Sequence, residues 1–117
     1  MSAMIVISTE DGVALELALG SLPLTLGRAE GNVVRGSDRR LSRRHALLRR
    51  MRSGLYEVED LGSSNGTTVN GKPLEPGLAQ VLQPGDRIEC GGLCAEFRAE
   101  ELDERTPFEQ VDELRAE

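Results

Sequence analysis

The sequence predicts an all-β protein, an antiparallel β-sandwich of about eleven short strands. Short apolar segments, several of them alternating with polar residues, recur along the first hundred residues. Turn-forming Gly, Asn, Pro and Asp residues separate these segments at close intervals. No helical periodicity is present before residue 100. Closely spaced short strands of this kind are typical of a sandwich.

The expected strands follow one another through short turns. Residues 4–9 and 13–19 flank a turn at residues 10–12, and the second segment places three leucines on one face. The remaining strands are expected at residues 24–26, 33–34, 46–51, 55–60, 68–69, 72–74, 79–82, 87–90 and 93–97.

The two cysteines are expected to remain unpaired. If Gly91-Gly92 is a two-residue hairpin turn, Cys90 faces Leu93 and Cys94 lies opposite Glu89. Side chains alternate between the faces of a strand, so the two thiols then lie on opposite faces. This geometry argues against a disulfide. The one histidine is remote in sequence and no other cysteine exists, which argues against a metal site.

Length and composition indicate one domain without a membrane span. A chain of 117 residues can bury a modest core, and with 3% aromatic residues that core must be aliphatic. No stretch approaches the roughly 18 apolar residues of a membrane helix. The N-terminus lacks the basic and long apolar regions of a secretory signal. We therefore expect a cytoplasmic protein, and the starting Met1 with the tail suggests a short natural product.

Charge is distributed unevenly along the chain, whose net charge is −6. Residues 35–52 hold eight arginines against one aspartate, whereas residues 100–117 hold eight acids against two arginines. The basic region and the acidic end can attract each other.

The stretch from Asp60 to Gly71 is too rich in small polar residues to be packed core. It contains two Asn-Gly pairs, Asn65-Gly66 and Asn70-Gly71, which favour tight primed turns. Hydroxyls and backbone N–H groups between these pairs could hold an anion or a peptide backbone. A polar hairpin connection is the alternative interpretation of this stretch alone.

Four motifs in order resemble the forkhead-associated (FHA) domain. They are Gly27-Arg28, Ser42-x-x-His45, Ser64-Asn65-Gly66 and Pro84-Gly85-Asp86-Arg87-Ile88. The resemblance covers residues 4 to 99 and is closest to small single-domain bacterial FHA proteins. It implies an FHA domain over residues 1–99, followed by an acidic tail over residues 100–117. It also implies an eleven-stranded sandwich with its binding loops at one end.

The resemblance implies phosphothreonine-peptide binding. A phosphorylated threonine carries a charge of about −1.5 to −2 and three acceptor oxygens. An arginine fork and hydroxyl donors from separate loops suit such a group. By resemblance, Asn65 bonds the ligand backbone, and the phosphate contacts come from Arg28, Ser42, Arg43 and Ser64.

Other motif residues are expected to be structural. His45 invites a catalytic interpretation, but no pairing motif accompanies it, and in the family this histidine braces the binding loops. Turn and loop formation is expected of Gly27, Gly66, Asn70, Gly71 and Asp86. We expect no catalytic residue, metal or cofactor.

The loop before Ser42 departs from common family members, which often carry acids there. Here residues 35–40 read Arg-Gly-Ser-Asp-Arg-Arg. Arg40 resembles a position that in some members selects the residue three after the phosphothreonine. We therefore predict a preference for Asp or Glu at that ligand position.

The tail carries a capping-box pattern, with Thr106 as N-cap, Pro107 at the first helical position and Glu109 three residues after the cap. It is either a docked helix or a frayed extension. Because an acid lies three residues after Thr106, a phosphorylated tail is also a candidate ligand for this same domain. An ordinary helix cap uses the same residues.

These observations favour an interaction module that binds phosphothreonine proteins downstream of a Ser/Thr kinase. A phosphate-independent FHA scaffold is the first alternative. Nucleic-acid binding through residues 35–52 is a second, but few aromatic side chains are available to stack on bases and the chain is acidic. An enzyme is poorly supported, because no phosphate-cradling Gly-Lys motif or nucleophile elbow is present.

Overall fold

The computed structural model describes residues 3–9, 12, 14–20 and 23–99, which form eleven strands and no helix. The strands are β1 (Ala3–Thr9), β2 (Ala14–Leu19), β3 (Leu24–Gly27), β4 (Val34–Arg35), β5 (Ala46–Arg50), β6 (Tyr56–Asp60), β7 (Thr67–Val69), β8 (Lys72–Pro73), β9 (Gln80–Val81), β10 (Arg87–Cys90) and β11 (Leu93–Ala99). The predicted all-β class is confirmed. The expected tail, residues 100–117 with the cap at Thr106, lies outside the described residues.

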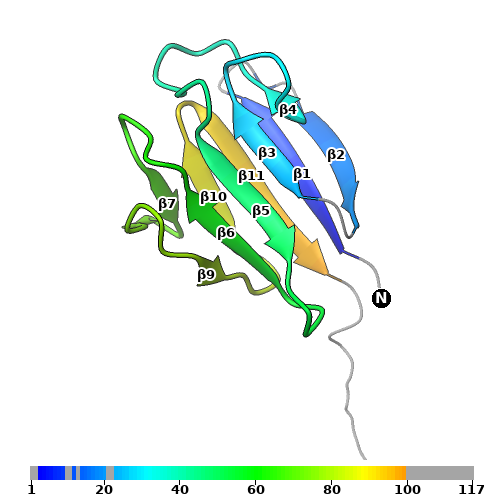
Figure 1. Cartoon of the computed structure of the whole chain (residues 1–117). Helices are drawn as coiled ribbons and strands as arrows, with labels where there is room; N and C mark the ends of the chain where they lie inside the picture. Colours follow the sequence, from blue (N-terminus) through cyan, green and yellow to red (C-terminus); the bar gives the residue numbers. More distant parts are fainter. Residues whose placement is uncertain (1–2, 10–11, 13, 21–22, 100–117) are drawn as a thin grey trace, which may run out of the picture.

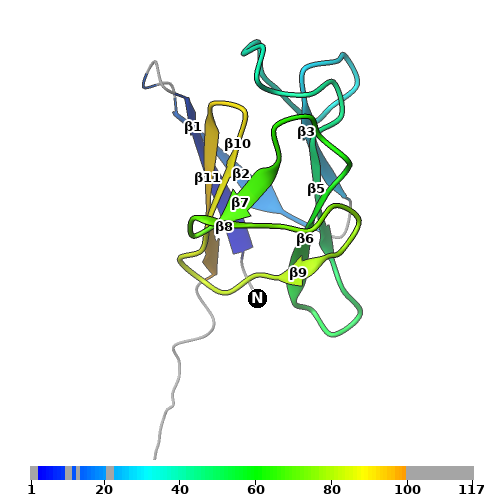
Figure 2. The same cartoon turned by 90° about the vertical axis from the view of Figure 1, so that its left-hand side faces the viewer.

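The strands form two sheets that face each other, as the edge-on view in Figure 2 shows. One sheet has the order β2-β1-β11-β10-β7-β8, and the other has the order β4-β3-β5-β6-β9. The chain crosses from one sheet to the other between β2 and β3, β6 and β7, β8 and β9, and β9 and β10. The predicted sandwich is therefore confirmed.

One strand pair differs from the antiparallel arrangement that the sequence predicts. β4 runs parallel to β3, with Leu26 opposite Val34 and Gly27 opposite Arg35. Parallel neighbours usually need a connection of a dozen or more residues. Here only two residues of β3 pair with two residues of β4. The loop of residues 28–33 therefore has only a very short distance to span.

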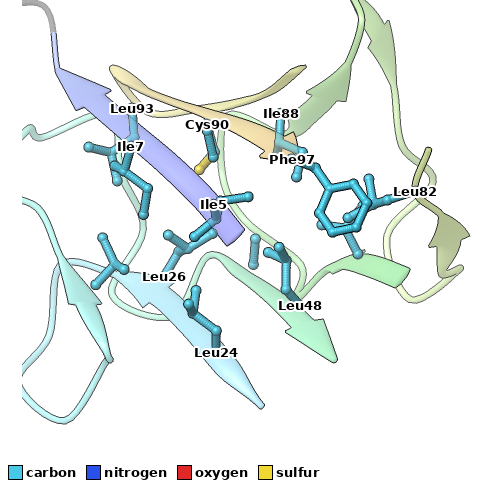
Figure 3. Packing of buried hydrophobic residues seen from close by; sticks show 14 of the residues in the cluster. Ile5, Ile7, Leu24, Leu26, Leu48, Leu82, Ile88, Cys90, Leu93 and Phe97 are labelled. Atoms are coloured by element: carbon cyan, nitrogen blue, oxygen red, sulfur yellow. The ribbon is translucent and has the colours of Figure 1, made fainter. Parts of the chain in front are cut away.

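An aliphatic core fills the space between the sheets (Figure 3). The inward positions alternate along the strands, as in β6, where Tyr56, Val58 and Asp60 are buried. Fully buried side chains such as Ile5 and Ile88 each stabilise the fold by about 1.5–3 kcal/mol relative to exposure. One aromatic pair supplements the aliphatic contacts across the sheets, since the rings of Tyr56 and Phe97 lie 5.6 Å apart.

The β10–β11 hairpin has the predicted register. Cys90 pairs with Leu93 and Glu89 pairs with Cys94 across the Gly91-Gly92 turn. Cys90 points into the core, Cys94 lies on the other face, and both thiols are free. Burial raises the pKa of the Cys90 thiol to about 12, so this thiol is an inert part of the core.

The two Asn-Gly pairs adopt different structures. Asn70 and Gly71 both have positive φ, at 53° and 84°, and form the tight turn between β7 and β8. At the other pair only Gly66 has positive φ. Because β6 and β7 belong to different sheets, Asn65-Gly66 lies in a crossing loop and does not close a hairpin.

Three long loops lie at one end of the sandwich, opposite the end where β1 begins (Figure 1). They join β3 to β4, β4 to β5, and β6 to β7. The three loops carry nearly all the residues that the sequence singled out for binding.

Within the residues described, no helix is long and apolar enough to cross a membrane.

Candidate functional site

Arg28 follows β3 directly and is fixed to the next loop. Its backbone N–H donates to the Ser42 carbonyl at 2.9 Å, and its side-chain Nε donates to the Leu41 carbonyl at 2.9 Å. The two terminal amino groups of the guanidinium have no partner among the described residues, and the residue is exposed. One edge of the fork is therefore anchored, while the outer edge is available to a ligand.

Gly27 allows this close approach of the two loops. A Cβ at Gly27 would lie 2.2 Å from the carbonyl oxygen of Arg43, a distance that no real side chain tolerates. Asn32 ties the same loops together, because its side-chain amide donates to the carbonyls of Ala29 at 2.7 Å and Arg43 at 2.8 Å. The sequence analysis missed Asn32, since an isolated asparagine in a loop carries no distinctive signal.

Ser42 and Ser64 come from different loops and meet directly. The backbone N–H of Ser64 donates to the Ser42 hydroxyl oxygen at 3.0 Å. A hydroxyl that accepts one hydrogen bond can still donate its own proton. The Ser42 hydroxyl is therefore able to donate to an anion beside Arg28, and the exposed side chain of Ser64 lies next to it.

His45 is fully buried beneath these residues and joins two of the loops. Its Nδ1 accepts the backbone N–H of Ser42 at 3.0 Å, so the ring proton must lie on Nε2. Nε2 then donates to the Gly66 carbonyl at 2.9 Å. Both ring nitrogens are thus used to hold backbone groups.

Asp60, at the end of β6, organises the β6–β7 loop and was missed by the sequence analysis. Its buried carboxylate accepts the N–H groups of Gly62 and Ser63 and the hydroxyls of Ser63 and Thr67, at 2.6–3.0 Å. Burial opposes ionisation, but these four hydrogen bonds outweigh it and hold the pKa of Asp60 below its ordinary value. A buried carboxylate with this many donors stays ionised and fixes the loop.

Asn65 and Arg40 are also brought together. The Asn65 side-chain amide donates to the Arg40 carbonyl at 2.9 Å. The Arg40 guanidinium binds both oxygens of Asp38, at 3.0 and 2.7 Å, and this hydrogen bonding lowers the pKa of Asp38 to about 2. Arg40 and Asn65 line a hollow of about 430 Å³ that extends to the β10–β11 turn.

Arg43 follows Ser42 in the β4–β5 loop. Its carbonyl binds Ala29 and Asn32, while its exposed side chain lines a hollow of about 750 Å³ together with Arg28. The five residues expected to contact the ligand therefore lie on three adjoining loops.

The remaining motif residues lie apart from this cluster. Asn70 bonds Asp86 at 2.9 Å and accepts the N–H of Arg87 at 3.0 Å, while Asp86 also accepts the N–H of Gln83 at 2.8 Å. These contacts join the β7–β8 turn to the turn before β10.

Adjoining loop segments thus carry the exposed guanidinium of Arg28 and the hydroxyls of Ser42 and Ser64, a group that we call the Arg28 cradle. Such a cradle can hold a tetrahedral anion on a surface without burying it. The described part of the chain gathers no group of three or more metal-ligating side chains. Fold and site thus define a β-sandwich with cationic and hydroxyl side chains on adjoining loops at one end.

Comparison with known families agrees with this class. The family model described as FHA domain matches residues 24–91, and the chain belongs to the FHA domain family. The predicted family is therefore confirmed.

Three relatives illustrate the similarity. An oxoglutarate dehydrogenase inhibitor from Corynebacterium glutamicum is 39% identical over 98 residues, which cover 84% of this chain and 66% of that protein. The chain thus spans slightly less than two thirds of that relative's length. A structure from a study of phosphothreonine-dependent FHA domain interactions is 29% identical with a TM-score of 0.71, covering 85% of this chain and 99% of the other. The FhaA FHA domain, solved in complex with the intracellular domain of Rv3910, is 30% identical with a TM-score of 0.68, covering 80% and 99%.

Proposed function

We propose that this chain is a phosphothreonine-binding interaction module that acts in Ser/Thr-kinase signalling in the cytoplasm. The observation that carries the proposal is the position of Arg28. Its exposed guanidinium is anchored to the carbonyl of Leu41, the residue before Ser42, and the Ser42 hydroxyl accepts the N–H of Ser64. A similar FHA domain is described as acting through phosphothreonine-dependent interactions, which supports the same ligand class. The role requires neither a cofactor nor catalysis.

The chemistry of the cradle fits a phosphate that must be bound and released. Arg28 supplies a fixed cation, and Ser42 and Ser64 supply neutral donors. Arg43 adds a second cation at the edge, and the carbonyl oxygen of the Asn65 amide is free to accept a ligand backbone N–H. Two or three charge-assisted bonds of about 1.5–3 kcal/mol each, less the ordering cost, give an affinity around micromolar.

The test compares two arginine variants on one pair of peptides. Arg28→Ala should abolish binding of a phosphothreonine peptide in isothermal titration, because the cation anchored to the Leu41 carbonyl beside Ser42 is lost. Arg52→Ala removes the same charge from the exposed β5–β6 turn and should bind like wild type. The unphosphorylated peptide should not bind either protein.

Retention of the physiological partner by Arg28→Ala, or after phosphatase treatment, would contradict the proposal. It would favour a phosphate-independent FHA scaffold instead.

We further propose that Arg40 selects an acidic residue three positions after the phosphothreonine. Arg40 lines the hollow next to Asn65, and its guanidinium already binds the carboxylate of Asp38. A ligand carboxylate would share or replace this partner. Arg40→Glu should weaken an acid-flanked peptide several-fold and leave a neutral-flanked peptide nearly unchanged. Equal loss for both peptides would exclude selectivity at this position.

The acidic tail supplies a candidate ligand within the chain itself. Phosphorylated Thr106 with Glu109 three residues later has the pattern that Arg40 would select. A phosphorylated peptide of residues 100–117 should bind the chain that carries Thr106→Ala, measured by fluorescence titration. Absence of binding at roughly hundreds of micromolar would contradict this proposal, because a tethered ligand works at about millimolar effective concentration.

A further inference from the structure

A basic hollow extends from Arg28 and is separate from the hollow that Asn65 lines. It measures about 750 Å³ and lies between the β3–β4 loop and the start of the β4–β5 loop. Among the described residues, its lining holds three arginines, Arg28, Arg35 and Arg43, together with the hydroxyl residue Ser37 and one acidic residue, Glu30. The hollow is therefore electropositive and open to solvent.

Arg35 is held in the same way as Arg28. Its Nε donates to the Arg28 carbonyl at 3.0 Å, which anchors one edge of the guanidinium. The terminal amino groups of Arg35 have no partner within residues 3–99 as described. The planar outer edge of a guanidinium suits a carboxylate or a phosphate, which it can bind through two parallel hydrogen bonds.

The arginines of this hollow differ from three other arginines of the fold. Arg40, Arg49 and Arg98 each form an ion pair with a nearby carboxylate. In contrast, Arg28, Arg35 and Arg43 form no ion pair in the part of the chain that the structure describes. Three clustered guanidinium groups repel one another, so an anion bound among them is favoured.

The two hollows share no lining residue: one includes Arg28 and Arg43 of the proposed phosphate site, and the other includes Asn65 and Arg40. If Asn65 and Arg40 contact the residues after the phosphothreonine, the Arg35 side faces the residues before it. We propose that Arg35 and Ser37 form a second anionic subsite, which binds an acidic or phosphorylated side chain one or two residues before the phosphothreonine. Consecutive Cα atoms are about 3.8 Å apart, so such a side chain can reach the adjoining hollow. This subsite rests on the proposed function of the Arg28 site.

The test uses four phosphothreonine peptides that differ only in their flanks. The first has neutral flanks, the second has Glu at the two preceding positions, the third has phosphoserine two residues before, and the fourth has Glu three residues after. Each is titrated into the wild-type chain, Arg35→Gln and Arg52→Gln. The last variant removes the same charge from the β5–β6 turn, at the opposite end of the sandwich (Figure 1).

We expect preceding Glu residues to tighten binding by about two- to fivefold, the range of exposed ion pairs. A preceding phosphoserine should tighten binding more than the Glu residues do if the subsite prefers phosphate, and by the same factor if any acid suffices. Arg35→Gln should remove this gain and leave the neutral and Glu-following peptides within about twofold of wild type. Arg52→Gln should retain every gain.

The inference is overturned if preceding acids give no gain, or if Arg35→Gln weakens all four peptides equally. The second outcome would indicate a general field effect instead of a subsite. Failure of the proposed function is a different result, because the neutral peptide would then not bind wild type at all.

Discussion

At the scale of single residues, the binding loops are held by side chains that would not touch a ligand. His45 uses both ring nitrogens on backbone groups of two loops, and Asp60 accepts four hydrogen bonds within one loop. Gly27 acts by having no side chain, since a Cβ would displace the Arg43 carbonyl. The position of the Arg28 guanidinium therefore depends on buried polar contacts as well as on its own bonds.

Replacing Asp60 with Asn tests this dependence. The amide can offer only one acceptor oxygen, so its amino group must face donors that the carboxylate accepted. Unsatisfied donors in a buried site should lower the free energy of unfolding by about 1–3 kcal/mol. Urea denaturation measures this loss, and the exposed Glu75→Gln should cause almost none.

The stability difference between wild type and Asp60→Asn should depend on pH, because the pKa of Asp60 is lowered in the fold. Its ionised form stabilises the fold fully above the ordinary value of 3.8, and this contribution is lost as the pH falls through the lower folded pKa. The stability difference between wild type and Asp60→Asn should therefore shrink below about pH 4. A difference that stays constant down to pH 2 would contradict the assigned role.

At the scale of elements, the β10–β11 hairpin braces a binding loop that belongs to the opposite sheet. A Cβ at Gly91 would lie 2.4 Å from the Cα of Leu41, and one at Gly92 would lie 2.6 Å from an Asp38 carboxylate oxygen. Leu41 itself is completely buried, and its carbonyl accepts the Nε of Arg28. The hairpin turn thus supports the loop segment that positions the guanidinium.

Gly91→Ala should therefore weaken phosphopeptide binding as well as stability. Gly77→Ala is a matched control, since Gly77 also has positive φ but would bring its Cβ near no other atom. Both variants should lose about 1 kcal/mol or more of stability to backbone strain. Only Gly91→Ala should reduce affinity, by several-fold in titration. Equal affinities of the two variants would show that the hairpin does not position Arg28.

The strands could largely be predicted from the sequence, whereas the contacts between distant segments could not. Alternation and turn residues predicted β10, β11 and the Gly91-Gly92 turn, because hairpin register is a local property. The contact of that turn with Leu41 joins segments fifty residues apart, and nothing local signals it. The parallel pairing of β4 was missed for the same reason, since two residues carry no direction.

At the scale of the whole molecule, the chain passes between two sheets so that three separate loops meet at one end (Figures 1 and 2). The family resemblance predicted Arg28, Ser42, Ser64 and Asn65 as one group, and the structure places them on adjoining loops. The roles of Asn32, Asp60 and the Arg35 hollow could not be predicted, because they depend on three-dimensional contacts between loops. We therefore expect the ligand to contact this end alone.

Nuclear magnetic resonance titration of the labelled chain with a phosphothreonine peptide tests this central claim most directly. The amide signals of Arg28, Ser42, Ser64 and Asn65 should shift together with one midpoint, while that of Gly71 stays in place. Arg28→Ala should abolish the shifts and leave the rest of the spectrum unchanged. Shifts centred on another face, or equal shifts with the unphosphorylated peptide, would contradict a phosphate cradle at the loop end.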